Sequence, residues 1–193
     1  MTEFVTADPH FLHEAIIESC NRPFKNCHVM NNSLVSTWNS IVTDNDDVYV
    51  AGDLTLATKA HRGTIEQIVN RLKGRIHLVL GNHDIPDARF WSEIGIWSIH
   101  FPYFELHEFV IVHDPALSAV DRKRPFLCGH VHDLFSFQKN VLNVGMDIWE
   151  YKPISLNDVR HFFLGTYDDE PEKMTVSDHY MDLIRKRATR GES

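Results

Sequence analysis

A short stretch with side chains suited to catalysis, Gly81-Asn82-His83-Asp84, directly follows the apolar run 76–80. An apolar, β-branched run that ends at glycine is typical of a buried strand that delivers its last residues to a loop. On such a loop an asparagine can ligate a metal, a histidine can move a proton, and an aspartate can orient that histidine. Four residues of this kind also fit an ordinary Asx turn, so the rest of the chain must decide between chemistry and a turn.

Other predicted strands end in the same way, on residues that bind metals. The side chains concerned are Asp8 and His10, Asp53, His113, and His130 with His132. In an α/β fold the loops at one edge of a sheet meet in a common crevice, so residues far apart in the sequence can converge there. Together with Asn82 these positions predict a metal centre, which would also account for the 13 histidines of this 193-residue chain.

The donors of this set are carboxylate, amide and imidazole groups, without thiolate. Such donors fit Mn²⁺, Fe, Zn²⁺, Ni²⁺ or Co²⁺ better than a structural thiolate site. Two cations about 3.5 to 4 Å apart need a bridging anion, and Asp53 is the natural candidate. In an extended segment residues two apart face the same way. Asp8 with His10, and His130 with His132, could therefore each face one centre or be divided between two ions.

The elements that must position these side chains alternate between strands and helices. Strands are predicted over 4–7, 48–51, 76–80, 109–112, 126–128 and 141–144. Helices are predicted over 11–20, 31–43 and 64–73, and a last helix from about Ser155. The helix over 64–73 has a capping box at Thr64-Ile65-Glu66-Gln67 and a stop at Gly74. The aromatic-rich segment 85–108 mixes a short helix with a strand, and we interpret its rings chiefly as core rather than as a substrate platform.

Length and composition favour one domain of an ordinary soluble globular protein, with 43% hydrophobic and 24% charged residues. We expect that domain over residues 1–165 and a linker and tail over 166–193, either helical or frayed. The three cysteines form no CxxC pair, so a disulfide framework is not expected. A net charge of -8 makes duplex nucleic acid an unexpected partner. The chain has neither an apolar run of about 18 residues nor a signal-type N-terminus, so we expect a cytoplasmic protein without a membrane partner.

Taken in order, these motifs resemble those of the calcineurin-like metallophosphoesterases, specifically their small single-domain bacterial and phage-type members. The matching segments are Asp8-x-His10, Gly52-Asp53, Gly81-Asn82-His83-Asp84, His113 and Gly129-His130-x-His132, with Asn21-Arg22-Pro23-Phe24, Trp38-Asn39 and Asn143-Val144-Gly145-x-Asp147 similar to the small subfamily. The resemblance covers about residues 3 to 160. It implies an α/β fold, a four-layer sandwich in which two mixed sheets are flanked by helices.

The resemblance also implies how two divalent ions, with manganese favoured, divide the ligands. One ion would take Asp8, His10, Asp53 and His132, and the second would take Asp53, Asn82, His113 and His130. The family often has an aromatic or hydrophobic residue after the ligand histidine. Here Asp114 follows His113, which adds a carboxylate to the surroundings of the second ion.

The implied reaction is hydrolysis of a phosphoester by a hydroxide that bridges the two metals. His83 binds no metal in this scheme and would donate a proton to the leaving alkoxide. Asp84 would either fix the His83 ring or serve as a turn residue. Arg22 would either clamp a phosphate oxygen or lie at a helix end, and His13 would either support the site or be solvated.

The substrate expected for this site is a nucleotide or another small phosphodiester, because the short chain leaves little room for a cap domain. The alternative within the class is a phosphomonoesterase acting on a small phosphorylated metabolite. An alternative from another class is a metal-bound scaffold without activity that binds a protein partner. Cleavage of nucleic-acid strands is disfavoured by the acidic balance of the chain, although a few local contacts would suffice to hold a strand.

Overall fold

Short apolar and β-branched runs form the strands, and all the predicted strands are confirmed to within one residue at each end. They are β1 (Glu3–Thr6), β2 (Asp47–Val50), β3 (Arg75–Val79), β6 (Phe109–Val112), β7 (Phe126–Cys128) and β9 (Val141–Asn143). The structure, a computed structural model that describes residues 1–120 and 123–166, adds β4 (Ser98–His100), β5 (Tyr103–Leu106), β8 (Phe137–Gln138) and β10 (Ile154–Ser155). These additions are short edge strands, which carry the weakest hydrophobic pattern.

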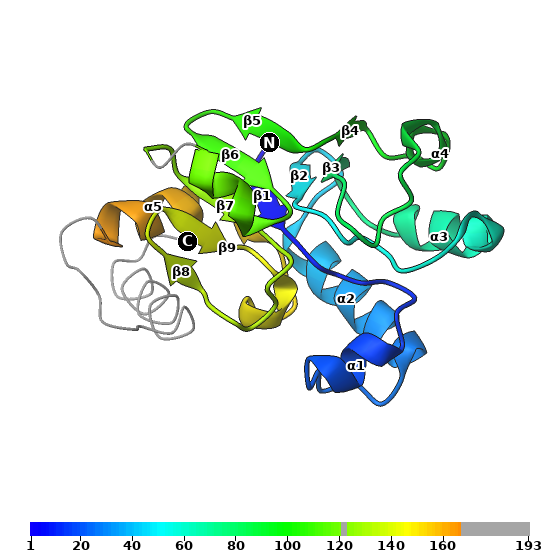
Figure 1. Ribbon diagram of the computed structural model, residues 1–193. Helices are drawn as coiled ribbons and strands as arrows, with labels where there is room; N and C mark the ends of the chain where they lie inside the picture. Colours follow the sequence, from blue (N-terminus) through cyan, green and yellow to red (C-terminus); the bar gives the residue numbers. More distant parts are fainter. Residues whose placement is uncertain (121–122, 167–193) are drawn as a thin grey trace.

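The strands form two five-stranded mixed sheets, as expected (Figure 1). In the first sheet, of order β10-β1-β2-β3-β4, strands β1 to β4 are parallel and β10 runs antiparallel to β1. In the second, of order β5-β6-β7-β9-β8, strands β6, β7 and β9 are parallel and the two edge strands are antiparallel. A bridge between Ala7 and Gly145 joins the two sheets just beyond β1 and β9. The carboxyl ends of the central strands of both sheets therefore meet at one place.

The helices are α1 (Ala15–Ser19), α2 (Cys27–Ile41), α3 (Arg62–Val69), α4 (Ala88–Glu93) and α5 (Leu156–Thr166), with short 3₁₀ turns η1 (Lys59–His61), η2 (Pro115–Val120) and η3 (Met146–Ile148). Helix α2 begins four residues before the predicted start because the Asn26 side chain caps it, accepting from the Val29 N–H at 2.9 Å. Helix α1 begins late because the backbone of Phe11 pairs with that of Thr55.

The capping box predicted at Thr64-Ile65-Glu66-Gln67 is wrong. Thr58 forms the box instead, with His61, at the start of η1. The turn runs directly into α3 at Arg62, so Thr64 already lies inside the helix. The segment at 64–67 has the sequence of a capping box, but the helical structure already begins at the box of Thr58, six residues earlier.

Three apolar clusters show the layers of the fold. One lies between the first sheet and α2, α3 and α4, and it buries Trp38, Trp91 and Leu78 completely. The second lies between the two sheets and includes α5 through Val159 and Phe163. The third covers the outer face of the second sheet with side chains from η2 and from the loop after β7. Packing on both faces of both sheets fixes the strand ends, and with them the loops that carry the polar motifs.

The domain boundary predicted at residue 165 and the tail beyond it remain predictions, because residues 167–193 lie outside the described part of the chain. Within the described residues, no helix has the length and apolar character needed to cross a membrane.

Candidate metal centre

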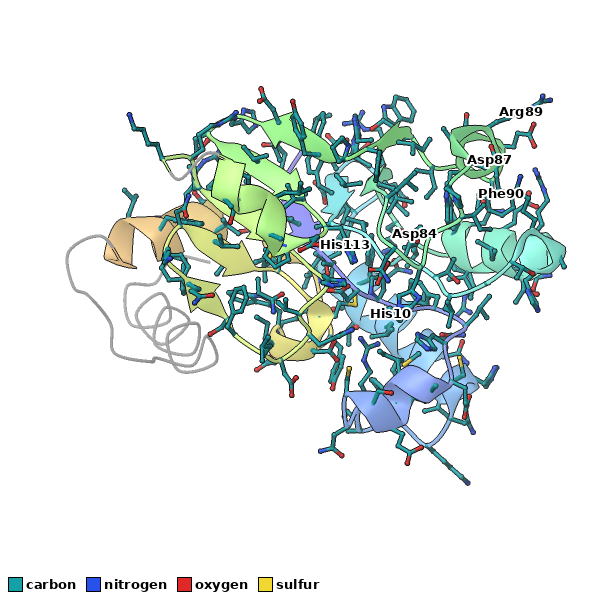
Figure 2. All side chains as sticks on the ribbon, viewed as in Figure 1. His10, Asp84, Asp87, Arg89, Phe90 and His113 are labelled. Carbon is teal, nitrogen blue, oxygen red and sulfur yellow. The ribbon has the colours of Figure 1, made fainter. Side chains whose placement is uncertain are left out.

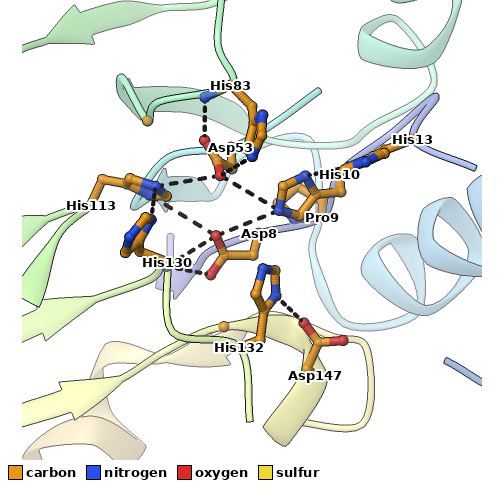
Figure 3. Close-up of polar contacts among 12 residues, drawn as sticks. Asp8, Pro9, His10, His13, Asp53, His83, His113, His130, His132 and Asp147 are labelled. Atoms are coloured by element: carbon orange, nitrogen blue, oxygen red, sulfur yellow. Dashed lines mark hydrogen bonds and ion pairs between the residues drawn. The ribbon is translucent and has the colours of Figure 1, made fainter. Parts of the chain in front are cut away.

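All the side chains predicted to bind metal lie where strands of the two sheets end; Figure 2 labels two of them, His10 and His113. Asp8 and His10 follow β1, Asp53 follows β2, Asn82 follows β3, His113 follows β6, and His130 and His132 follow β7. Figure 3 shows the two carboxylates at the centre of this arrangement, with imidazole rings on several sides. The parallel strands explain the convergence, because their carboxyl ends share one edge.

Asp53 is placed where the predicted bridging ligand should be. Its Oδ2 lies 3.5 Å from His10 Nε2 and 3.4 Å from His113 Nε2. Two groups of possible ligand atoms share it, one with Asp8 and His10 and the other with His113 and His130. Asn82 belongs to the second group, since its Oδ1 lies 2.8 Å from His113 Nε2 and 2.9 Å from His130 Nδ1.

His132 is held from behind by a residue that the sequence did not place in the site. Its Nδ1 lies 2.9 Å from Asp147 Oδ2, and its ring centroid lies 5.2 Å from that of His10. A hydrogen bond from Nδ1–H to a carboxylate leaves Nε2 as the ring nitrogen available to a metal. Asp147 stands just after β9, so the same signal of a carboxylate at a strand exit was present in the sequence.

The residues fit a divalent cation, and the clearest sign is an unpartnered atom. His10 is fully buried, and its Nε2 has no hydrogen-bond partner. Its other ring nitrogen lies 3.1 Å from Nδ1 of His13, so His13 supports the ring. Buried polar atoms are almost always satisfied. A nitrogen that faces the carboxylates of Asp8 and Asp53 at 3.9 and 3.5 Å would be satisfied by a cation bound between them.

Most of these ligands have an unusual backbone. The φ angles are 56° for Asp8, 51° for His10, 53° for Asp53, 73° for His130 and 48° for His132. The left-handed region is unfavourable for residues with a Cβ, and such conformations are retained where surrounding contacts impose them. These unfavourable backbone conformations direct the side chains toward the centre, and the contacts of the surrounding fold maintain them.

Glycines in the motifs make room for ligands that come from other strands. A Cβ on Gly81 would overlap the Asp53 carboxylate, and one on Gly129 would lie 2.7 Å from Asp8 Oδ2. A Cβ on Gly52 would likewise overlap the His113 ring. Each contact is closer than a side-chain carbon allows, so the glycines are required for the ligands to approach the backbone.

Burial and mutual charge shift the proton affinities of the ligands. Burial raises the pKa of Asp8 to about 7, although His113 and His132 oppose the shift. Burial likewise lowers the pKa of His10 to about 3. Burial also acts against ionisation of both Asp53 and His113, but the hydrogen bond and opposite charge between them outweigh it. They hold the pKa of Asp53 at about 2 and that of His113 at about 9. Without a metal, a protonated His113 therefore supplies the positive charge beside Asp53.

His83 occupies the open side of the centre. Its backbone N–H donates to Asp53 Oδ1 at 2.9 Å, and its ring Nε2 lies 3.9 Å from Asp53 Oδ2. The side chain is 38% exposed, in contrast to the buried His10 below it. The ring can therefore reach a molecule that enters from solvent.

Asp84 does not contact the His83 ring as one of the two expectations required. Its carboxylate accepts from the backbone N–H groups of Asp53 at 2.8 Å, Gly81 at 2.9 Å and Thr55 at 3.3 Å. It is buried, and burial raises its pKa to about 6. The alternative expectation, a turn residue, describes Asp84 better, and its turn ties the loop after β2 to the loop after β3.

Arg22 also differs from the expected phosphate clamp. It is 4% exposed, and its guanidinium donates to Asp147, to the backbone oxygens of Asp8 and Pro9, and to Met30 Sδ. No donor is left to reach a phosphate oxygen. The sequence shows that an arginine precedes α2, but it does not show that the side chain points into the protein.

Taken together, the fold and the ligand set define a two-sheet α/β protein whose strand-end loops bring together residues that could bind a divalent metal. The family model for calcineurin-like phosphoesterases matches residues 1–184. The chain belongs to this family and is a metal-dependent phosphoric ester hydrolase.

The chain is also similar to two other proteins, at different levels of sequence identity. The uncharacterized protein MJ1445 of Methanocaldococcus jannaschii is 32% identical over 163 residues, which cover 80% of this chain and 86% of that protein. The crystal structure of AQ665, a protein of unknown function from Aquifex aeolicus, superimposes with a TM-score of 0.66 at 21% identity, over 83% of this chain and 98% of the other. The second likeness supports the fold alone.

Proposed function

We propose that the protein hydrolyses a nucleotide or another small phosphodiester at a centre of two divalent ions, with Mn²⁺ preferred. The inner ion would be held by Asp8, His10, Asp53 and His132, and the outer ion by Asp53, Asn82, His113 and His130. The observation that carries the proposal is the position of Asp53 Oδ2, which faces a ring nitrogen of each set at 3.5 and 3.4 Å. Such a pair of ions supplies an activated water and neutralises phosphate oxygens.

His83 is the residue we assign to proton transfer. It lies beside Asp53 on the open side of the centre, and it belongs to neither ligand set. A histidine in this place can donate a proton from its ring to the oxygen of the departing alcohol. The backbone N–H of His83 donates to Asp53 and keeps the ring next to the shared carboxylate, so the proton donor is tied to the ligand that both ions would share.

The charges around the opening favour a diester over a monoester. A monoester carries up to two negative charges at neutral pH and a diester carries one. The guanidinium of Arg22 lies behind the centre, where Asp147 and backbone oxygens engage it, so it does not neutralise a second phosphate charge at the opening. The outward side chains Asn82, His83 and His130 offer an amide and imidazoles, which suit the lower charge.

The substrate class is tested by comparing rates on bis(p-nitrophenyl) phosphate and p-nitrophenyl phosphate after reconstitution with Mn²⁺. We expect a higher kcat/KM for the diester. A higher kcat/KM for the monoester would establish the phosphomonoesterase alternative. Hydrolysis of neither, with both metal positions filled, would favour the scaffold that binds a protein partner.

The role of His83 is tested by His83→Ala. We expect kcat to fall by about 10²- to 10⁴-fold, the usual contribution of a positioned acid or base, with two ions still bound as measured by elemental analysis. His161→Ala is the matched control, since His161 is exposed on α5 and its ring contacts the backbone oxygen of Asn157. Equal loss of metal and activity in His83→Ala would show that His83 is a ligand.

A further inference from the structure

Arg22 lies behind the centre with its full set of donors in use. Its Nε and Nη2 donate to the two oxygens of Asp147 at 2.7 and 2.9 Å. Its Nη2 also donates to the backbone oxygen of Asp8 at 2.8 Å, and its Nη1 donates to that of Pro9 at 3.0 Å. The side chain has no exposed surface. A cation that is buried to this degree and paired in a fork–fork geometry is held rigidly.

The oxygen atoms that accept from Arg22 all belong to the surroundings of the inner ion. The peptide oxygens of Asp8 and Pro9 belong to the two peptide bonds that link Asp8 to His10. Along this segment the φ angle is 56° at Asp8 and 51° at His10. Asp147, the third acceptor, contacts His132 Nδ1 at 2.9 Å. The guanidinium of Arg22 therefore connects two parts of the centre. It binds the loop after β1 directly, and through Asp147 it is linked to the ring of His132 in the loop after β7.

We propose that Arg22 and Asp147 form a buried positioning pair that fixes Asp8, His10 and His132 in their metal-binding arrangement and thereby sets the affinity of the inner ion. This rests on the division of ligands in the proposed function. The outer ion depends on the pair less directly, because Asn82, His113 and His130 contact one another and Asp53. Their link to the pair runs through Asp8, whose carboxylate accepts from the His130 backbone N–H at 2.9 Å.

The molecule contains a second arginine–aspartate pair of the same geometry. Arg75 donates to Asp47 through Nε at 2.7 Å and through Nη2 at 2.6 Å. That pair joins β2 to β3 at their amino ends, because Asp47 and Arg75 are register partners at the first residue of each strand. It lies at the opposite end of these strands from the metal ligands. A variant of the Arg75–Asp47 pair is therefore a control. It shows what the loss of any fork–fork ion pair does to the protein, so that the specific effect of losing the Arg22–Asp147 pair can be recognised.

The experiment is a titration of the metal-free protein with Mn²⁺, in which free Mn²⁺ is counted by electron paramagnetic resonance. The variants are Arg22→Met, Arg22→Lys, Asp147→Asn, Arg75→Met and Asn82→Ala. Asn82→Ala identifies the outer step, because Asn82 contributes to that ion alone. Circular dichroism confirms that each variant is folded before it is titrated.

We expect Arg22→Met to weaken the inner step by about 10- to 100-fold, the usual effect of removing a residue that orients a ligand, and to leave the outer step within about twofold. Arg22→Lys keeps the charge without the fork and should fall between wild type and Arg22→Met. Arg75→Met should change neither step. If Arg22→Met does not fold, Asp147→Asn is judged by the same criteria, because it retains an oxygen for His132.

Unchanged inner affinity in a folded Arg22→Met or Asp147→Asn protein would overturn the positioning pair. Equal weakening of the inner step by Arg75→Met would also overturn it, since the effect would then be general. If the wild-type protein binds a single ion, the two-ion centre fails. The comparison of Arg22→Met with Arg75→Met on that single ion would still decide the role of the pair.

Discussion

The two halves of the metal centre are built differently. In the inner half, Asp8 and His10 are fully buried, and Arg22 and Asp147 lie behind the ligands. In the outer half, Asn82 and His130 are exposed, and the atoms that would face the ion lie 2.8 to 3.2 Å from one another. His10 Nε2 in the inner half has no partner, whereas the outer ligands already satisfy each other.

This difference shows two ways in which a protein can prepare a cation site. The inner half resists collapse, because its backbone and its ligand rings are held from behind, so a buried nitrogen remains available. In the outer half Asn82 and His130 are exposed, and the ligand atoms of Asn82, His113 and His130 contact one another. We therefore expect the inner ion to be bound more tightly and the outer ion to exchange more readily.

The largest effect is expected at Asp53, the one ligand that both halves share. Asp53→Asn leaves one neutral amide oxygen in place of the two carboxylate oxygens and removes the negative charge between the ions. We expect loss of both Mn²⁺ steps and a fall in kcat/KM on the order of 10³-fold, equivalent to about 4 kcal/mol. Mn²⁺ titration and diester hydrolysis measure these effects. Retention of one ion at wild-type affinity would show that the halves are independent.

The next largest effect concerns the loops between the halves. Asp84→Ala leaves three backbone N–H groups without their acceptor, which should lower the free energy of unfolding by about 2 to 3 kcal/mol. Asp84→Asn keeps one acceptor oxygen and should lose less. Urea denaturation of the metal-free proteins measures both. Wild-type stability in Asp84→Ala would show that this brace contributes nothing to the fold.

A smaller change tests how tightly the inner half is packed. Gly129→Ala would place a Cβ 2.7 Å from Asp8 Oδ2 and 2.6 Å from Ala7 Cβ, at a cost of about 1 to 3 kcal/mol of stability. Gly63→Ala is the matched control, because nothing lies within 4 Å of its Cβ position. Urea denaturation and Mn²⁺ titration compare the two. Equal stability and equal Mn²⁺ affinity of the two variants would show that the inner half can accommodate an added methyl group at Gly129.

The smallest effect is a difference in proton release at pH 8. Opposite charge from Asp53 outweighs burial and holds the pKa of His113 at about 9, so the outer ion must displace about one proton. Its affinity should rise with pH up to about 9. Burial gives His10 a pKa of about 3 and Asp8 one of about 7, so these two ligands release almost no proton at pH 8. His132, whose pKa the hydrogen bond to Asp147 raises, is the inner ligand that contributes to release, and we expect the inner step to release fewer protons than the outer step. Calorimetry in two buffers of different ionisation enthalpy counts these protons. Equal release in both steps would contradict the difference between the halves.

The strand exits that converge on the centre were predictable, because apolar runs that end in a ligand type carry a strong local signal. The places of Arg22 and Asp84 were not, since the direction of a side chain at a loop depends on what packs against it. The role of Asp147 was missed for the same reason. It depends on contacts with His132, fifteen residues away in the sequence, and with Arg22, which comes from another part of the fold. The left-handed backbone of Asp8 and His10 was equally hidden, because no glycine marks it.

The glycines of the motifs have a consequence for protein engineering. Gly81 leaves space for Asp53, Gly129 for Asp8, and Gly52 for His113, so each motif carries the clearance for a ligand that another motif supplies. A single motif transferred to another protein would bring its own ligands, but the space beside its glycine would lack the ligand that another motif supplies here. The transferable unit is the interlocked set of strand-end loops.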